Sequence, residues 1–537
     1  MPRTIELFDT TLRDGAQWEG INFSLGDKLN IARKLDSLGL TYIEGGYPGS
    51  NARDLDFFRQ AAEMTWQHAT IVAFGSSRRK DTRPEDDSNL QTLVLTQTRA
   101  VCIVVKSWDF HVTDVLQTTL EENLHMVAES VAFLKRHIPL VFVDLEHYFD
   151  GLKHNRDYTL QVLRTAADAG ADRLVLCDTN GGSLPEDIGC GVDAARAETA
   201  VILGIHTHND AELGVANTLV GVAHGATHVQ GTINGYGERC GNANLCSIIP
   251  NLQLKLGYDC LPPEKLGELT EVSRYVSEVA NLSHPNALPY VGESAFAHKA
   301  GYHANAMLKD ATTYQHIEPA LVGNKQRILV SELSGRSTYL LKAGQFGIDL
   351  ADNPGIAKEV SDQVKVLESQ GYEFEAAEAS LELLMRRADP AYQAPFQVID
   401  LVVMMQKRGD LATFSEATVK LQVDGETVHT VADGNGPVNA LDAAMRKALL
   451  PNFPGLRDVR LNDYKVRVLD EAAGTAAWVR VLIESTDGHR TWSTVGGSSN
   501  VVEASWRALA DSFEYAVMGE AGTYRSTTQP KLGNDAY

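Results

Sequence analysis

Eight short apolar runs, rich in β-branched residues, recur through the first half of the chain and alternate with stretches of helical periodicity. The runs lie at 5–11, 41–47, 70–76, 101–107, 139–148, 172–179, 201–208 and 227–234. Strands that alternate with helices predict a parallel α/β fold. Eight strand–helix repeats over about 250 residues are typical of a (β/α)8 barrel, or TIM barrel. A doubly wound sheet is the main alternative, but no G-x-G-x-x-G motif follows the first run, which disfavours it.

Residues 25–39 illustrate the helical stretches. Apolar residues between Leu29 and Leu38 fall mostly on one face of a helix, as expected for a surface helix that packs on a sheet. Ser24 is a suitable N-cap, and Gly39 is a suitable residue just beyond the last turn. The sequence therefore predicts a helix that begins after Ser24 and ends before Gly39.

The barrel pattern ends near residue 275, so we expect a barrel domain over 1–275 and further domains in a chain of 537 residues. Residues 276–390 predict a connecting segment of helices and loops. Within it, 283–306 is rich in Pro, Gly and Asn and is expected to be a loop. The stretch 356–387 is rich in Ala, Glu and Leu and is expected to be helical.

From residue 391 onward the sequence repeats a small α+β pattern. Two predicted β-hairpins turn at Asp424-Gly425 and at Asp487-Gly488, and a helical stretch follows each, at 437–450 and 500–516. The pattern predicts an internal β-β-α duplication over 391–525. Tandem units of this kind more often bind a ligand or a second subunit than perform chemistry. Residues 526–537 predict a disordered tail.

The charge balance narrows the possible partners. Lys and Arg number 48 against 70 Asp and Glu, a formal net charge of −22, which disfavours nucleic acid or an anionic membrane as a partner. The six cysteines show no C-x-x-C spacing and are expected to be reduced thiols. The N-terminus lacks the apolar core of a signal peptide, and no apolar stretch reaches the ~18 residues of a membrane helix. We therefore expect a cytoplasmic protein.

Catalytic groups of a barrel lie where strands end, and polar residues gather there in this chain. His206 and His208 end the seventh run, and residues two apart on a strand point to the same side. Asp14 follows the first run and is a natural carboxylate partner, with the amide of Asn242 as a further ligand. Such an oxygen and nitrogen set suits Mg²⁺, Mn²⁺, Co²⁺ or Zn²⁺. The alternative is a pair of hydrogen-bonded histidines without a metal.

Other polar residues at strand ends have both a functional and a structural interpretation. Arg13 could hold a carboxylate or an enolate, or it could form a structural ion pair with Asp14. Glu44, Glu146 and Thr179 are further residues expected to point inward, and the structural alternative for each glutamate is a salt bridge. His303 and Tyr314 lie beyond the barrel, where composition and spacing give no reason to assign them a function.

Six ordered segments resemble a known family: FDTTLRDGAQ, YIEGGYPGS, CDTNGG, GIHTHND, GYGERCGNAN and AHKAGYHANA. They are similar to the signature segments of the 2-isopropylmalate, homocitrate and citramalate synthases, which are metal-dependent TIM-barrel acyltransferases. The resemblance covers nearly the whole chain, including the duplicated C-terminal half, which looks like their regulatory domain. The segments GAQWEGINFSLGDK, VVKSWDFHV and LEHYFDGLKHN resemble the citramalate synthase branch.

The resemblance implies a Claisen condensation. Acetyl-CoA loses a methyl proton, the resulting enolate attacks the keto group of a 2-oxo acid, and hydrolysis of the thioester releases CoA. For the citramalate branch the acceptor is pyruvate, in isoleucine biosynthesis. Trp18, Phe74 and Trp108 are bulky residues that could restrict the acceptor pocket to a methyl group. The alternatives are a 2-isopropylmalate synthase that takes 2-oxoisovalerate, and a metal-dependent aldolase or lyase on the same barrel.

The resemblance also implies roles for single residues. The positions that match the family's metal ligands are Asp14, His206, His208 and Asn242. Arg13 matches the arginine that stabilises the oxyanion, Glu44 the glutamate that orients it, and Thr179 and Gln17 substrate-binding positions. Proton removal and water activation are assigned to Glu146, His303 and Tyr314. In some members His303 comes from the partner subunit, so a homodimer is implied, with isoleucine as the expected C-terminal effector.

Overall fold

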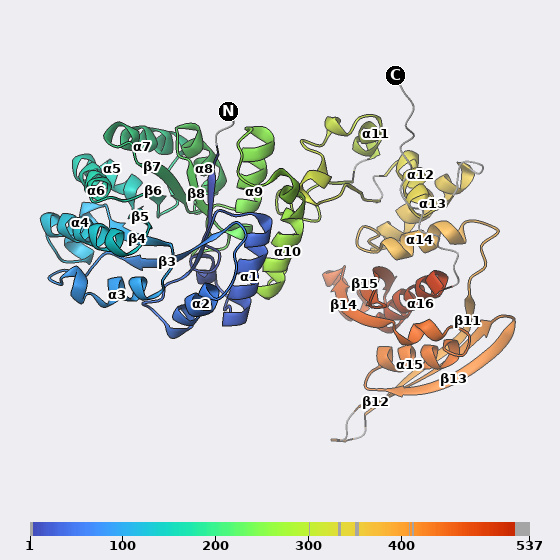
Figure 1. Ribbon diagram of the computed structural model, residues 1–537. Helices are drawn as coiled ribbons and strands as arrows, with labels where there is room; N and C mark the ends of the chain where they lie inside the picture. Colours follow the sequence, from blue (N-terminus) through green and yellow to red (C-terminus); the bar gives the residue numbers. More distant parts are fainter. Residues whose placement is uncertain are drawn as a thin grey trace. The chain divides into compact units, whose positions relative to one another are not determined.

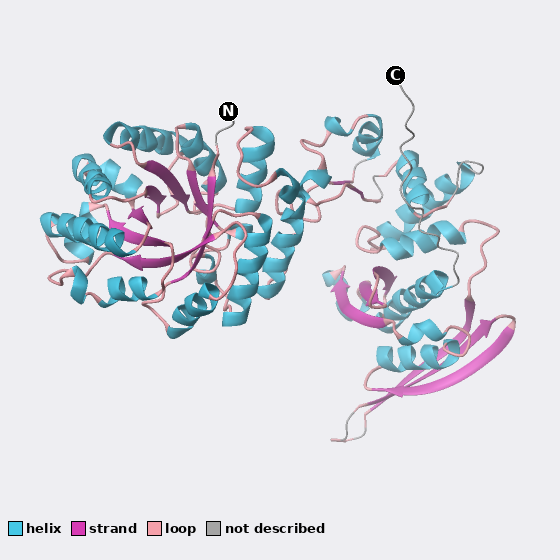
Figure 2. Cartoon of the chain, in the orientation of Figure 1, coloured by secondary structure: helices cyan, strands magenta, loops and turns pink. Residues whose placement is uncertain are grey.

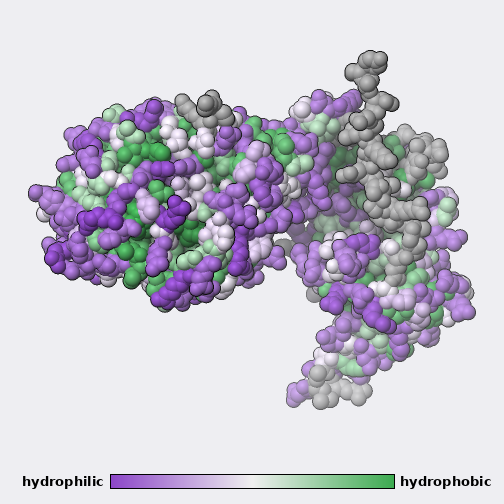
Figure 3. All heavy atoms as spheres, viewed as in Figure 1, coloured by the Kyte–Doolittle hydropathy of each residue, from purple (hydrophilic) through white to green (hydrophobic). Residues whose placement is uncertain are grey.

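The computed structural model describes residues 4–299, 301–330, 334–348, 354–407, 409–410 and 413–520. The chain divides into two compact units (Figure 1). The first comprises Met1–Phe296 and His316–Gln326, and the second comprises Ala297–Gln315 and Arg327–Tyr537. The predicted tail at 526–537 lies outside the described residues. Hydrophilic side chains cover most of the face drawn in Figure 3, with apolar side chains in smaller patches.

The first unit is a closed barrel of eight strands in the order β1 to β8, and every neighbouring pair is parallel. Helices surround the strands (Figure 2). The predicted TIM barrel is confirmed. Seven strands fall within a predicted run, and β4 begins one residue before the run at 101–107. The strands are β1 (Glu6–Asp9), β2 (Tyr42–Gly46), β3 (Thr70–Ser76), β4 (Ala100–Lys106), β5 (Leu140–Glu146), β6 (Arg173–Asp178), β7 (Ile202–Thr207) and β8 (His228–Gly231).

The helices of the barrel unit follow the strands in the expected alternation. They are α1 (Leu25–Leu38), α2 (Ala52–Ala62), α3 (Ser88–Leu95), α4 (Leu120–His137), α5 (Tyr148–His154), α6 (Arg156–Asp168), α7 (Pro185–Glu198), α8 (Gly214–Ala223), α9 (Leu245–Pro250) and α10 (Leu269–Val279). The predicted ends of α1 are confirmed. The side chains of Ser24 and Asp27 each accept the other's backbone N–H, and Gly39 ends the helix at φ 99°.

The barrel interior changes from aromatic to polar along the strands. Alternate strand residues face inward, and Phe8, Tyr42 and Phe142 form a packed floor with ring centroids 5.0 to 6.2 Å apart. Two residues beyond Tyr42 and Phe142 lie the buried Glu44 and Asp144, and β7 and β8 contribute the buried His206 and Gln230. A polar layer therefore lies at the carboxyl ends of the strands, next to an apolar floor.

The described residues of the segment after the barrel form short strands and helices, namely β9 (Ala297–His298), β10 (Arg327–Ile328), α11 (Gly301–Lys309), α12 (Arg336–Gln345), α13 (Pro354–Ser369) and α14 (Glu378–Arg387). The expected loop at 283–306 is partly wrong, because the residues after Gly301 include Ala, Met and Leu and form α11. The helical stretch 356–387 is confirmed but is broken after α13, where Gly371 takes φ 95°.

Two three-stranded antiparallel sheets follow, each completed by a helix. The first repeat has β11 (Phe396–Gln406), β12 (Phe414–Val423), β13 (Glu426–Gly434) and α15 (Pro437–Leu449), and the second has β14 (Arg460–Val468), β15 (Val479–Thr486), β16 (Thr491–Ser498) and α16 (Val501–Glu520). The repeating unit is thus β-β-β-α, and the predicted β-β-α unit lacked its first strand. Both first strands carry a bulge near the same point, between Val398 and Asp400 and between Leu461 and Asp463.

Two observations complete the fold. All six cysteines are free thiols, as expected. Within the described parts of the chain, no helix has the length and apolar character needed to cross a membrane.

Candidate active site

Asp14, His206 and His208 meet at the carboxyl ends of the strands. Asp14 lies in the turn after β1, and the two histidines lie at the end of β7 and just after it. The Nε2 atoms of His206 and His208 are 3.3 Å apart, and they lie 3.4 and 4.0 Å from Oδ2 of Asp14. Atoms that each sit about 2.0–2.2 Å from one ion lie at such separations from one another. The geometry therefore fits a shared metal ion, and metal binding itself stays a prediction.

A chain of two hydrogen bonds orients His206. Nε2 of Gln230 donates to Oδ1 of Asp144 at 3.0 Å, so the oxygen of the same amide faces His206. This oxygen lies 2.8 Å from Nδ1 of His206, which must therefore carry the hydrogen. The lone pair of His206 is then on Nε2, on the side of Asp14. The side chains of His206, Gln230 and Asp144 are all buried, so these hydrogen bonds are shielded from water.

The charges of the cluster suit a cation. Burial alone would raise the pKa of the Asp14 carboxyl, but Arg13 and the two histidines lower it well below its usual range. Burial and the neighbouring His206 lower the pKa of His208 to about 3, which keeps its imidazole neutral. Burial also lowers the pKa of His206, but the hydrogen bond and charge of Asp14 outweigh burial and raise it. The same negative charge would attract a metal ion.

Asn242 supplies a second test of the site. Its side chain is 2% exposed, and neither its oxygen nor its nitrogen has a hydrogen-bond partner among the described residues. A buried polar group without a hydrogen-bond partner costs about 1–3 kcal/mol of stability, so the amide of Asn242 is expected to bind a ligand. A backbone bridge joins Asn242 to His208. The preceding Gly241 takes φ +87°, and a Cβ there would lie 2.0 Å from the carbonyl oxygen of Gly235, so only glycine fits.

Arg13 is fixed from three sides. Its Nε donates to Oε2 of Glu44 at 2.7 Å, and its Nη1 lies 3.3 Å from Oδ2 of Asp14. Its guanidinium carbon sits 3.9 Å above the ring of Phe74. Thr10 donates to the same oxygen of Glu44 at 2.5 Å. The short contact makes Glu44 and Arg13 an ion pair. Burial raises the pKa of Glu44, and Arg13 opposes this rise.

Gln17 and Phe74 line a cavity of about 650 Å³ together with Arg13, Tyr47 and Arg53. Phe74 therefore faces the space beside Arg13, as the sequence suggested. Trp18 instead packs on Tyr236 with ring centroids 5.7 Å apart, and Trp108 stacks against His111 and His154. Neither tryptophan is among the residues that line this cavity.

Glu146 is the last residue of β5, and Thr179 is the first residue after β6, so both lie at the carboxyl ends of the barrel strands. Oγ1 of Thr179 accepts the backbone N–H of His147 at 2.8 Å, so its own hydrogen remains free to donate. His147 takes the left-handed conformation, with φ 57°, to place this N–H. Glu146 forms an ion pair with Lys106 and lies 4.0 Å from Nδ1 of His111.

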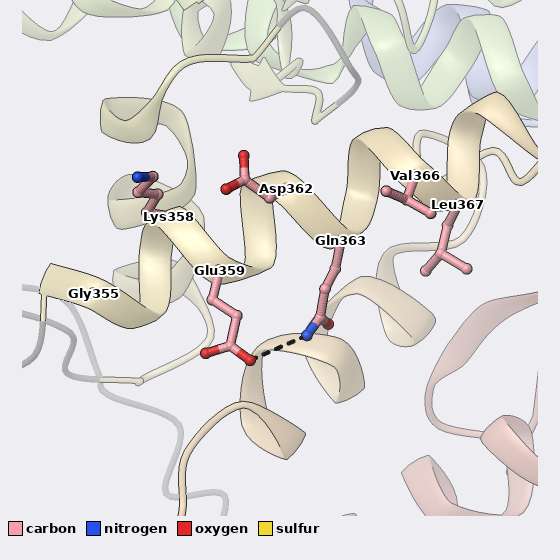
Figure 4. A pocket seen from close by; sticks show the side chains of 7 residues that line it. All are labelled: Gly355, Lys358, Glu359, Asp362, Gln363, Val366 and Leu367. Atoms are coloured by element: carbon pink, nitrogen blue, oxygen red, sulfur yellow. Dashed lines mark hydrogen bonds between the residues drawn. The ribbon is translucent and has the colours of Figure 1, made fainter.

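His303 and Tyr314 belong to the second unit. Their rings pack together with centroids 4.2 Å apart, and the Tyr314 side chain is exposed. A separate depression lies over α13, and all its labelled residues come from that one helix (Figure 4). None of the predicted site residues lines it.

Sequence reasoning missed Gln230, Lys106, His111 and His147. The signal for Gln230 was a polar residue at an inward position of the eighth run. The signal for the others was their place in the segments VVKSWDFHV and LEHYFDGLKHN, at the ends of two adjacent strands.

Comparison with known proteins gives three family models along the chain: HMGL-like over residues 4–276, homocitrate synthase post-HMGL domain-like over 290–371, and LeuA allosteric (dimerisation) domain over 375–517. The (R)-citramalate synthase of Aquifex aeolicus is 53% identical over 96% of this chain and 98% of its own length. The chain belongs to the (R)-citramalate synthase family. The family's protein from Geobacter sulfurreducens is 50% identical over 95% of this chain and 97% of its own.

This membership confirms the family inferred from the motifs and the expectation of an acyltransferase. A probable 2-isopropylmalate synthase of Methanopyrus kandleri is 31% identical over 95% of this chain and 97% of its own. The five (R)-citramalate synthases at 43 to 53% identity are all more similar than that protein.

Proposed function

We propose that this chain condenses acetyl-CoA with pyruvate and releases (R)-citramalate and CoA, a step towards isoleucine. The observation that carries the proposal is the buried Asp14, His206 and His208 cluster, in a chain that matches (R)-citramalate synthases over nearly its whole length. Asp14, His206, His208 and Asn242 would hold a divalent cation, whether Mg²⁺, Mn²⁺, Co²⁺ or Zn²⁺. A cation bound there supplies Lewis acidity to the keto group of the acceptor.

Arg13 and Thr179 are the proposed anchors of the acceptor. The guanidinium of Arg13 is held by Glu44 and stays charged, so it can bind the carboxylate and stabilise the oxyanion that forms on the keto oxygen. The hydroxyl of Thr179 can donate to the same carboxylate, because its oxygen is held by the N–H of His147. Gln17 contributes a further polar group to the cavity beside Arg13.

Proton transfer is proposed for Glu146, His303 and Tyr314. One of these groups removes the methyl proton of acetyl-CoA, and the set also activates the water that hydrolyses the thioester. Glu146 is supported by its place at the carboxyl end of β5. His303 and Tyr314 are supported by their mutual ring contact and by the matching family motif.

Phe74 supports pyruvate as the acceptor over 2-oxoisovalerate. Its ring lies against Arg13, so the group that binds the acceptor carboxylate is flanked by a bulky side chain. A larger acceptor would need that space. A 2-isopropylmalate synthase activity is the second candidate, because a relative with that name matches the chain over most of its length.

The C-terminal repeats are proposed to bind a second copy of the chain and an effector, isoleucine. The LeuA allosteric (dimerisation) model covers this part of the chain. The edge strands β11 and β14 expose apolar side chains, including Met404, Met405, Leu461 and Val466 at 46 to 66% exposure. Large exposed apolar side chains on a sheet edge are typical of an interface. We assign catalysis to 1–275, connection to 276–390, which contributes His303 and Tyr314, and regulation to 391–525, in a cytoplasmic enzyme.

Release of free thiol from acetyl-CoA tests the activity. The proposal expects release that requires both pyruvate and a divalent cation, with citramalate as the product. His208→Ala is the matched variant, since it removes one proposed ligand, and it should lose both cation binding and release. Wild-type enzyme that releases no CoA with pyruvate, or a His208→Ala variant that retains both properties, would contradict the proposal.

A further inference from the structure

A second group of possible metal ligands lies at the carboxyl ends of β4 and β5, apart from Asp14, His206 and His208. His111 begins a short helical turn after β4, Glu146 is the last residue of β5, and His147 follows it. One ligand atom from each of these three residues lies within 4.8 Å of the others. The rings of His111 and His147 have centroids 4.3 Å apart. The proposed reaction uses the backbone N–H of His147 to hold Thr179, but it assigns no role to either imidazole.

Both imidazoles offer a nitrogen lone pair. Nδ1 of His111 is buried and has no hydrogen-bond partner among the described residues, although Oε2 of Glu146 is only 4.0 Å away. This distance equals that between His208 and Asp14 in the first cluster. Burial and the neighbouring His147 lower the pKa of His111. Nδ1 of His147 lies 2.8 Å from a carboxylate oxygen of Asp150, so it carries the hydrogen and Nε2 holds the lone pair.

A positively charged side chain already lies beside Glu146 in this cluster. The ammonium group of Lys106 forms the ion pair with Glu146, on the same carboxylate oxygen that His111 approaches. The side chains of Lys106 and Glu146 are both 24% exposed, so the lysine can turn towards solvent without leaving a buried charge behind. A divalent cation could therefore replace the ammonium group beside the two imidazoles.

We propose that His111, Glu146 and His147 form a second cation site, which takes a transition metal such as Zn²⁺ in preference to Mg²⁺. Two imidazoles and one carboxylate are a nitrogen-rich set, whereas Mg²⁺ prefers oxygen ligands. The second part of the inference rests on the proposed function. Because Glu146 belongs to the proposed proton-transfer groups, an ion at this site would withdraw it from catalysis and inhibit the enzyme.

Zinc binding to the full-length protein tests the site without reference to activity. Equilibrium dialysis should find one zinc ion fewer per chain in His111→Ala than in wild type, while the first cluster keeps its own. His154→Ala is the matched control, since His154 also stacks on Trp108 but lies outside the cluster. It should bind as many zinc ions as wild type. Wild type and both variants keep the same exposed thiols, so any zinc bound there cancels when the zinc counts of the variants are subtracted from that of wild type.

Equal zinc counts in wild type and His111→Ala would overturn the site, as would an equal loss in His154→Ala. Glu146→Gln provides a second variant and should also lose one zinc ion. The circular dichroism of each variant checks that it is folded.

Inhibition tests the link to Glu146. With Mg²⁺ present, the zinc concentration that halves CoA release should be about tenfold or more higher in His111→Ala than in wild type. If the zinc counts differ as expected but zinc inhibits both proteins equally, the site stands and its link to catalysis fails. If wild type releases no CoA at all, the proposed function fails while the zinc counts still decide the site.

Discussion

Gln230 has no predicted contact with substrate, yet the structure makes it the support of a metal ligand. In Gln230→Leu, Nδ1 of His206 loses its acceptor, and Asp144 loses the buried donor that now lies 3.0 Å from it. His206 is then free to take the other tautomer or to rotate away from Asp14. Partners of this kind typically contribute 10- to 100-fold to metal affinity, or about 1.4–2.7 kcal/mol. We therefore expect Mn²⁺ to bind Gln230→Leu about 10- to 100-fold more weakly than wild type.

Electron paramagnetic resonance of free Mn²⁺ during titration measures this affinity directly, without an activity assay. Asp144→Asn is the matched control. Its amide oxygen can still accept from Gln230, so Gln230 keeps its orientation and the affinity should fall by much less. A Gln230→Leu variant that binds Mn²⁺ as tightly as wild type would show that the hydrogen bonds do not orient His206 for a metal.

Three further results are expected. Phe74→Ala should raise the ratio of kcat/KM for 2-oxoisovalerate to that for pyruvate by about tenfold or more, since each added methyl group is worth ~1–3 kcal/mol in such a pocket. An unchanged ratio would show that Phe74 does not limit the size of the acceptor. Burial would raise the pKa of Glu6, but hydrogen bonds from Arg173 and His228 lower it from 4.5 to about 2. Its stabilisation is therefore complete above pH 4.5 and lost as the pH falls towards 2. The difference in thermal midpoint between wild type and Glu6→Gln should shrink over that range; a constant difference would contradict this. A chain truncated after about residue 390 should lose inhibition by isoleucine, and retained inhibition would place the effector elsewhere.

Much of the barrel was predictable because its signals are local. Each β-branched run became a strand, and Ser24 and Gly39 marked the ends of α1. The metal cluster was predictable for a related reason. His206 and His208 are two residues apart on one strand, and a closed barrel must bring the end of β7 close to the turn after β1.

Contacts between strands were harder to predict. Gln230 reaches Asp144 from across the barrel, and His111 meets His147 only because β4 and β5 are neighbours. The alternation of apolar and polar residues along a strand does not show which side chains of different strands meet. The first strands of the C-terminal repeats were missed for another reason. β11 and β14 are edge strands that expose apolar side chains, so their sequences do not alternate between buried apolar and exposed polar residues.

The choice of acceptor is the central claim, and a steady-state comparison of four 2-oxo acids tests it most directly. Pyruvate, 2-oxobutyrate, 2-oxoisovalerate and 2-oxoglutarate would each be assayed with acetyl-CoA and the same divalent cation, with CoA release as the readout. The structure and the relatives of this chain predict the highest kcat/KM for pyruvate, a lower value for 2-oxobutyrate, and little turnover of the branched and dicarboxylic acids. A higher kcat/KM for 2-oxoisovalerate than for pyruvate would contradict the account.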